Sequence, residues 1–157
     1  MIYFAYGSNL DPVQFAARCP GHRVLGNARL PDHRLCFPRR SPVRGCAVAS
    51  IEPVQGEAVW GVLYALCDPD VTALHAAEGY ACDRPAAECR YVPAAVRVLA
   101  DGRAADAVQA FTYVAVRDGI DPGLPSRTYL DHILRGAAHH GLPRAWQDRL
   151  GRLDAAG

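Results

Sequence analysis

The first residues of this chain constrain its fold most, because they join a buried strand to a polar turn and a helix start. Residues 2–6 are apolar and aromatic, which is typical of a buried β-strand. A Gly-Ser-Asn turn at 7–9 ends that strand, and Asp11-Pro12 then predicts a helix with Asp11 as N-cap and Pro12 at its first position. Such a turn gathers backbone N–H groups that can hold a carboxylate, a phosphate or a developing oxyanion. An ordinary strand-to-helix turn has the same composition, so the pattern alone leaves both interpretations open.

Length and charge narrow the class of protein. A chain of 157 residues and 16.9 kDa is expected to form a single domain over residues 1–157. The net charge is +1 and every basic charge is an arginine, which gives no reason to expect nucleic acid or a membrane surface as a partner. No apolar run approaches the ~20 residues of a membrane span and no leader precedes the first strand, so we expect a cytoplasmic protein. Its six cysteines lack metal-ligand spacing, which predicts reduced thiols and no metal site.

The remaining sequence predicts more strands than helices, in a mixed order without a βαβ repeat. Strands are expected at 22–30, 33–37, 45–51, 57–66, 90–99 and 105–116. Helices are expected at 11–18, 68–79 with Asp68 as N-cap, 126–139 with Ser126 as N-cap, and from Pro143 onward. Breaks are expected at Pro31-Asp32, 38–44, 53–56 and the hairpin turn Asp101-Gly102. This order favours an α+β domain with one curved, barrel-like sheet.

Glu78 is the strongest candidate for chemistry. On a helix it shares one face with Val71 and Leu74, so its carboxyl should point toward the protein interior. It also lies at the C-terminus of that helix, where the helix dipole disfavours a negative charge. Burial and the dipole both raise a carboxyl pKa, which makes a better base near neutral pH. The alternative is a surface glutamate that pairs with Arg84 or Arg90, since most glutamates are solvated.

Three tyrosines in later elements are further candidates for the same site. The simplest interpretation of Tyr91, Tyr113 and Tyr129 is that they are half-buried core residues whose hydroxyl groups reach water. A functional role depends on their lining one cavity with Glu78 and the 7–9 turn. Spacing alone does not decide this.

Four segments in this order together resemble the gamma-glutamylcyclotransferase family. Residues 3–10 are similar to its first strand and substrate loop, 57–62 to its central strand, 77–79 to the place of its catalytic glutamate, and 129–150 to its closing helices. The resemblance covers nearly the whole chain. It implies an α+β fold in which a small mixed β-barrel of about five to seven strands is flanked by helices.

The resemblance also implies an activity and a set of roles. In the family, the α-amine of a γ-glutamyl group attacks its own γ-carbonyl, which releases an amino acid or amine and leaves 5-oxoproline. Glu78 would be the general acid/base, and no cofactor or metal is required. The implied substrate-binding residues are Tyr3, Phe4, Ala5, Tyr6, Gly7, Ser8, Asn9, Tyr91, Tyr113 and Tyr129. The expected partner is a small γ-glutamyl substrate, with no nucleic acid and no membrane, and the resemblance also allows a homodimer.

One stretch departs from the typical mammalian-type enzyme. Residues 80–90 form a longer segment than the corresponding stretch of that enzyme, and they should lie at the rim where the leaving group exits. The resemblance therefore does not identify the leaving group. The glutathione-specific branch of the family is less similar to this chain. Two alternatives also stay open. One is a hydrolase of γ-glutamyl amides, and the other is a non-catalytic module that binds a small carboxylate.

Overall fold

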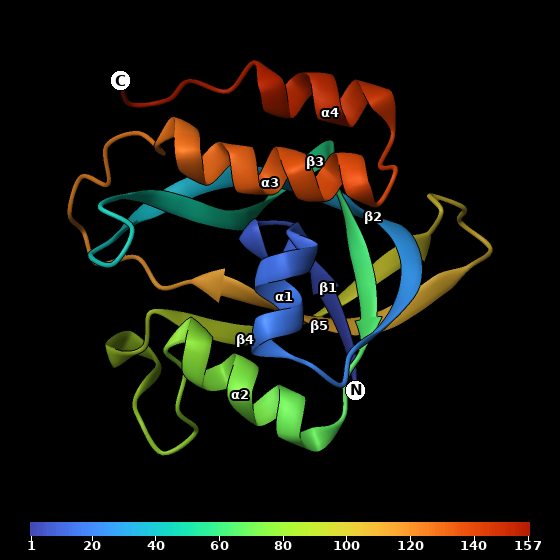
Figure 1. Cartoon of the computed structure of the whole chain (residues 1–157), viewed down its shortest axis with the longest axis horizontal. Helices are drawn as coiled ribbons and strands as arrows, with labels where there is room; N and C mark the ends of the chain where they lie inside the picture. Colours follow the sequence, from blue (N-terminus) through green and yellow to red (C-terminus); the bar gives the residue numbers. More distant parts are fainter.

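The computed structural model describes residues 1–157 and shows a closed five-stranded barrel with helices packed around it (Figure 1). The order around the barrel is β1 (Ile2–Ala5), β3 (Cys46–Ala65), β2 (Arg23–Ser41), β4 (Tyr91–Ala100) and β5 (Ala107–Ala115). All neighbours are antiparallel except β1 and β5, which pair in parallel and close the barrel. The expected α+β fold with a mixed β-barrel is therefore confirmed.

Four α-helices and two short 3₁₀ turns complete the chain. The helices are α1 (Pro12–Arg18), α2 (Asp68–Glu78), α3 (Arg127–His139) and α4 (Arg144–Gly151), and the 3₁₀ turns are η1 (Ser8–Leu10) and η2 (Ala86–Glu88). Figure 1 shows α3 and α4 side by side at the top, α2 at the bottom, and α1 between them beside β1. None of these helices has the length and apolar character needed to cross a membrane.

Most of the predicted helix caps lie at the residues where they were expected. The Asp11 carboxylate accepts from the N–H groups of Val13 and Gln14, and the Ser126 hydroxyl accepts from Tyr129 N–H. Gly79 ends α2 in the left-handed conformation with φ 72°. The N-cap of α2 was predicted one residue too late, since Asp68 is already helical and Cys67 precedes it.

Two strands are much longer than the sequence pattern predicts. β2 runs through Pro31-Asp32 and into the expected 38–44 loop, and β3 runs through the expected 53–56 turn. The register between them shifts between Pro31 and His33 and again between Cys36 and Arg39. Proline is tolerated at such bulges, because the ladder loses a bond there in any case. The prolines therefore bend long strands that the local pattern predicts to end.

The core fills the barrel and the space beneath the helices. Its largest fully buried side chains include Phe4, Phe15 and Tyr64, and the rings of Phe15 and Tyr64 stack with centroids 4.1 Å apart. Leu10 is also fully buried and packs beneath α3. This packing fixes the turn after β1 against both α1 and α3.

Candidate functional site

The turn between β1 and α1 forms one wall of the site. Its bonds run from Leu10 N–H to the Gly7 carbonyl at 3.0 Å and from Asp11 N–H to the Ser8 carbonyl at 3.1 Å. No hydrogen bond within the chain uses the N–H of Gly7. The turn also packs closely on β3, since an added Cβ at Gly7 would lie 3.3 Å from Ala49 Cβ. The turn thus leaves one backbone N–H without a partner, next to Ala49 of β3.

The Asn9 side chain connects this turn to α2. Its Nδ2 donates to Tyr3 Oη at 2.9 Å and to Glu78 Oε1 at 2.8 Å, and its Oδ1 accepts from Arg18 Nη1 at 2.7 Å. Gln14 Nε2 approaches the same Oδ1 at 3.4 Å. Asn9 is 5 % exposed, and in these contacts its amide nitrogen donates while its amide oxygen accepts. The amide therefore fixes the position of the Glu78 carboxylate.

Glu78 points into the protein from the last turn of α2. Its side chain is 14 % exposed and lies on the face shared with the buried Val71 and Leu74. The nearest cation is Arg18, with Nη1 3.5 Å from Glu78 Oε1. The alternative of a surface pair with Arg84 or Arg90 is thus not what the structure shows. Arg90 instead donates to the Ala77 carbonyl at 3.1 Å.

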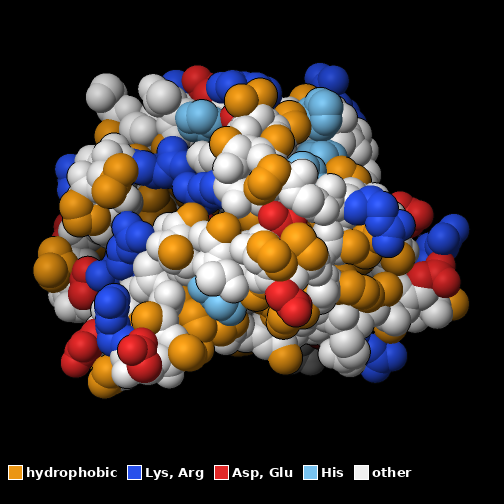
Figure 2. Space-filling model, turned by 60° about the horizontal axis from the view of Figure 1, so that its bottom comes forward, with side chains coloured by type: hydrophobic (Ala, Val, Ile, Leu, Met, Phe, Trp, Pro, Cys, Tyr) orange, Lys and Arg blue, Asp and Glu red, His pale blue; other side chains and the backbone are white.

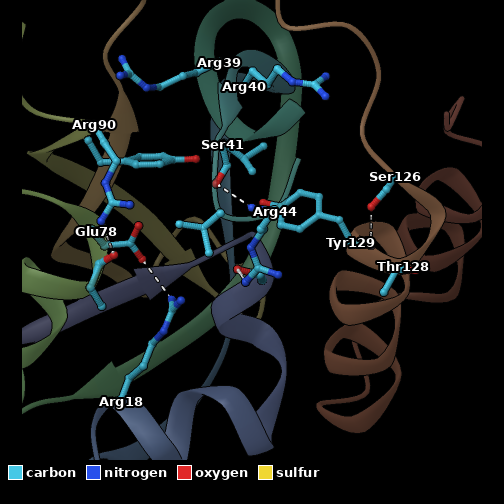
Figure 3. Close-up of a pocket in the computed structure, with 15 residues that line it drawn as sticks. Arg18, Arg39, Arg40, Ser41, Arg44, Glu78, Arg90, Ser126, Thr128 and Tyr129 are labelled. Carbon is cyan, nitrogen blue, oxygen red and sulfur yellow. Dashed lines mark hydrogen bonds and ion pairs between the residues drawn. The ribbon is translucent and has the colours of Figure 1, made fainter. Parts of the chain in front are cut away.

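The environment of Glu78 shifts its acidity in a definite direction. Burial raises the pKa of the Glu78 carboxyl above its ordinary value. The charge of Arg18, the hydrogen bond from Asn9, and the charges of Arg90 and Arg44 each lower that pKa in part, and the pKa stays raised. In Figure 3, Arg90 and Arg18 approach Glu78 from opposite sides. A carboxylate in this setting can take a proton more readily than a solvated glutamate.

Two adjoining cavities meet at Glu78. The outer cavity has a volume of ≈ 720 Å³, and the inner recess has ≈ 30 Å³. Ser8, Glu78, Tyr91 and Tyr129 line both. The recess is completed by Tyr3, Tyr6, Gly7, Asn9, Ala49 and Tyr113.

The tyrosine hydroxyls mainly hold the walls of the recess. Tyr91 Oη donates to the Ala49 carbonyl at 2.6 Å, and Tyr129 Oη accepts from Ala49 N–H at 2.9 Å. Tyr113 Oη lies 2.6 Å from Nδ1 of His75. Tyr6 Oη donates to the carbonyl of Tyr113. Burial raises the pKa of the Tyr129 hydroxyl to about 12, so it stays protonated at neutral pH.

Eight of the ten expected substrate-binding residues line the recess, and two do not. Phe4 and Ala5 line neither cavity. Both are fully buried in β1; the carbonyl of Phe4 accepts from Thr112 Oγ1, and the Ala5 carbonyl lies against Gly61. These two residues therefore build the barrel wall, and the neighbouring turn reaches the cavity.

Several residues at the site were not predicted as site residues. Arg18 and Gln14 reach Asn9 from α1, and Arg44 reaches Gln14 Oε1 at 2.6 Å from the β2–β3 hairpin. The i, i+4 spacing of Gln14 and Arg18 on the predicted helix and the arginine-rich composition of 38–44 were the available signals. No group of three or more His, Cys, Asp or Glu side chains is placed to hold a metal ion, and all six cysteines are free.

Comparison with known proteins gives the class. The model of the AIG2-like family matches residues 58–150, more than half of the chain, and the chain belongs to this family. A solved structure described as gamma-glutamyl cyclotransferase superposes with a TM-score of 0.85 and is 27 % identical, with 99 % of this chain and 88 % of that chain covered. The expected resemblance to the gamma-glutamylcyclotransferase and AIG2-like family is confirmed.

Two further solved structures place the chain within this fold. A human protein described as uncharacterized superposes with a TM-score of 0.85 at 28 % identity, over 99 % of this chain and 88 % of that chain. A yeast gamma-glutamyl cyclotransferase specific to glutathione has a TM-score of 0.62 at 12 % identity, over 96 % of this chain and 93 % of that chain, a likeness of fold alone. A search of the curated proteins finds no match.

Proposed function

We propose that this protein is a γ-glutamylcyclotransferase that converts a γ-glutamyl compound to 5-oxoproline and a free amine. The observation that carries the proposal is the buried Glu78 carboxylate, which Asn9 holds at 2.8 Å on the wall of a cavity shared with the Gly7 turn. The 27 % identity to a structure described as gamma-glutamyl cyclotransferase supports it. A carboxylate with a raised pKa suits a reaction that must first deprotonate an ammonium group.

The chemistry divides among three parts of the site. Glu78 takes a proton from the α-ammonium, and the freed amine attacks the γ-carbonyl carbon to form the new C–N bond. The N–H of Gly7 is free to donate to the developing oxyanion, a contact typically worth about 3 kcal/mol in related reactions. The bond to the leaving nitrogen then breaks as Glu78 gives that nitrogen the first proton. The ring nitrogen loses its second proton through the same carboxylate, so the lactam forms and the released amine departs as an ammonium. No water is consumed.

The recess positions the reacting groups. It is too small for a whole glutamyl group, so the remainder of the substrate extends into the outer cavity. The Tyr91 and Tyr129 hydroxyls bind the main chain of Ala49 and keep this wall rigid. A rigid wall supports the folded substrate geometry in which amine and carbonyl meet.

The test is 5-oxoproline formation from a panel of γ-glutamyl compounds, followed by mass spectrometry. We expect Glu78→Gln and Glu78→Ala to lower kcat at least ~100-fold. Glu57→Gln is the matched control, since Glu57 forms a surface pair with Arg149 outside both cavities. Free glutamate as the product would identify a hydrolase instead. Saturable binding without any product would identify a binding module.

A further inference from the structure

Arginines dominate the outer cavity. It is lined by Arg18, Arg39, Arg40, Arg44 and Arg90, and Glu78 is the only carboxylate among its lining residues. These six side chains carry a formal charge of +4, while the whole chain carries +1. Figure 2 shows the same concentration on the surface, with arginine side chains gathered around a hollow at the left of this face.

Three of these guanidinium groups have no carboxylate within 4.0 Å: those of Arg40, Arg44 and Arg90. Each is held by a neutral acceptor instead. Arg40 donates to the carbonyl of Gly45 at 2.6 Å, Arg44 to Gln14, and Arg90 to the carbonyl of Ala77. A guanidinium has five N–H donors, so each keeps donors for a ligand. These three guanidinium groups are therefore held in place without direct contact to a carboxylate.

Arg39, the start of α3 and Tyr129 complete the surroundings of these cations. Arg39 is paired only at 3.8 Å, with Asp118, and donates to the carbonyl of Val116. Ser126 and Thr128 line the cavity at the start of α3, where the helix dipole is positive. Arg44 lies over the ring of Tyr129, with its Cζ 4.9 Å from the ring centroid. The cations thus surround the part of the cavity beyond the recess.

The γ-glutamyl group itself does not balance this charge. Its α-carboxylate and α-ammonium cancel, so a γ-glutamyl amine brings no net charge to the cavity. Carboxylates on the leaving group do, and planar guanidinium groups bind carboxylates with two parallel hydrogen bonds. A cleft lined by one sign of charge also concentrates ligands of the opposite sign.

We propose that the outer cavity is an anion-binding subsite that selects γ-glutamyl compounds whose leaving group is an acidic amino acid or a short acidic peptide. This inference rests on the proposed function and names its substrate class. The reaction is unchanged: the amine nitrogen forms the new C–N bond and gives up two protons, the old amide bond breaks, and the amino acid departs with its carboxylates and those two protons on its nitrogen.

Three substrates test this selectivity. γ-Glutamyl-glutamate and γ-glutamyl-glutamine are nearly isosteric and differ by one negative charge, and γ-glutamyl-butylamine has no leaving-group carboxylate. We expect kcat/KM to fall at least ~10-fold from the first to the second and again to the third. The preference should shrink as salt rises, because the rim of the cavity is open to solvent. Equal kcat/KM for the first two substrates would overturn the proposal.

A matched pair of variants assigns the selectivity to the arginines. Arg40 and Arg97 are both exposed strand arginines without a carboxylate partner, but only Arg40 lines the cavity. Arg40→Gln should reduce the ratio of kcat/KM for glutamate over glutamine as leaving groups, and Arg97→Gln should leave that ratio at its wild-type value. An unchanged ratio in Arg40→Gln and in Arg90→Gln would also contradict the proposal.

Binding separates this inference from the proposed function. Calorimetric titration of Glu78→Gln with the same compounds measures their affinity without turnover. Tighter binding of γ-glutamyl-glutamate with no 5-oxoproline from the wild type would keep the anion subsite and reject the cyclotransferase. Turnover of all three compounds at equal kcat/KM, with equal affinities, would keep the cyclotransferase and reject the subsite.

Discussion

Asn9 Nδ2 donates to Glu78 Oε1 at 2.8 Å and so joins the turn after β1 to the end of α2, 69 positions later in the chain. The same amide group accepts from Arg18 and donates to Tyr3. A single side chain thereby sets where the carboxylate lies and what surrounds it. The predictions that concern Glu78 follow from this bond.

Asn9→Asp replaces a donor to Glu78 with a second carboxylate. Like charges at hydrogen-bond distance raise the pKa of one member, so the pair should hold a proton at neutral pH. We expect 5-oxoproline formation at pH 7 to fall at least ~100-fold, with the loss smaller at higher pH. Asn9→Ala is the companion variant, since it removes the hydrogen bond without adding charge. An equal loss at every pH in both variants would contradict this explanation.

The pH profile of the wild type should report the raised pKa of Glu78. A base acts only when deprotonated, so kcat/KM should fall as the pH drops through the Glu78 pKa, and this limb should lie above that of a solvated glutamate. Arg18→Gln removes a charge that lowers this pKa and should move the limb to higher pH. Arg18→Lys keeps the charge and should leave the limb close to its wild-type position. Measured kcat/KM between pH 4 and 9 checks both.

Asp11 should stabilise the fold in two ways, through its negative charge and through its role as the N-cap of α1. Burial raises its pKa, but the hydrogen bonds from His132 and from the N–H groups of Gln14 and Val13, with the charge of Arg135, lower it below its ordinary value. The ionised form therefore stabilises the protein above the unfolded pKa near 4, and this contribution is lost as the pH falls through the lower folded pKa.

Two substitutions of Asp11 separate these effects. Asp11→Asn keeps a good N-cap and removes the charge, so its deficit in urea unfolding at pH 7 should shrink below about pH 4. Asp11→Ala also removes the cap and should cost about 1 kcal/mol more at all pH values. A deficit of Asp11→Asn that is the same at pH 3 and pH 7 would contradict a role for the charge.

Gly136 should be essential for the packing of α3 on the turn. A Cβ at Gly136 would overlap the backbone of Leu10, which cannot move without displacing the 7–9 turn. We expect Gly136→Ala to lower the free energy of unfolding by about 1–3 kcal/mol or more. Gly151→Ala is the control, because no atom lies within 4 Å of an added Cβ there, and it should be neutral or stabilising by up to ~1 kcal/mol. Urea unfolding of both variants measures the difference.

Local sequence was sufficient to predict a structural feature wherever a residue bonds to its neighbours in the chain. Asp11 and Ser126 cap the helices that follow them, and Gly79 ends α2, because each makes its bond within a few residues. The inward face of Glu78 also follows from helical spacing alone. The long strands were missed because Pro31 and Pro38 interrupt the local pattern, while the pairing of β2 with β3 continues on both sides of each shift in register.

The sequence by itself determined the opening strand and turn, the helix caps, the strand-rich class and the direction of Glu78. Only the tertiary structure decided that Asn9 holds Glu78, that Phe4 and Ala5 line neither cavity, and that arginines surround the outer one. The physical reason is the separation along the chain of the residues that interact. Caps and helix faces are set by bonds within one or two turns, whereas Arg18, Arg44 and Arg90 meet around Glu78 only because the barrel closes and brings α1, the β2–β3 hairpin and the start of β4 together.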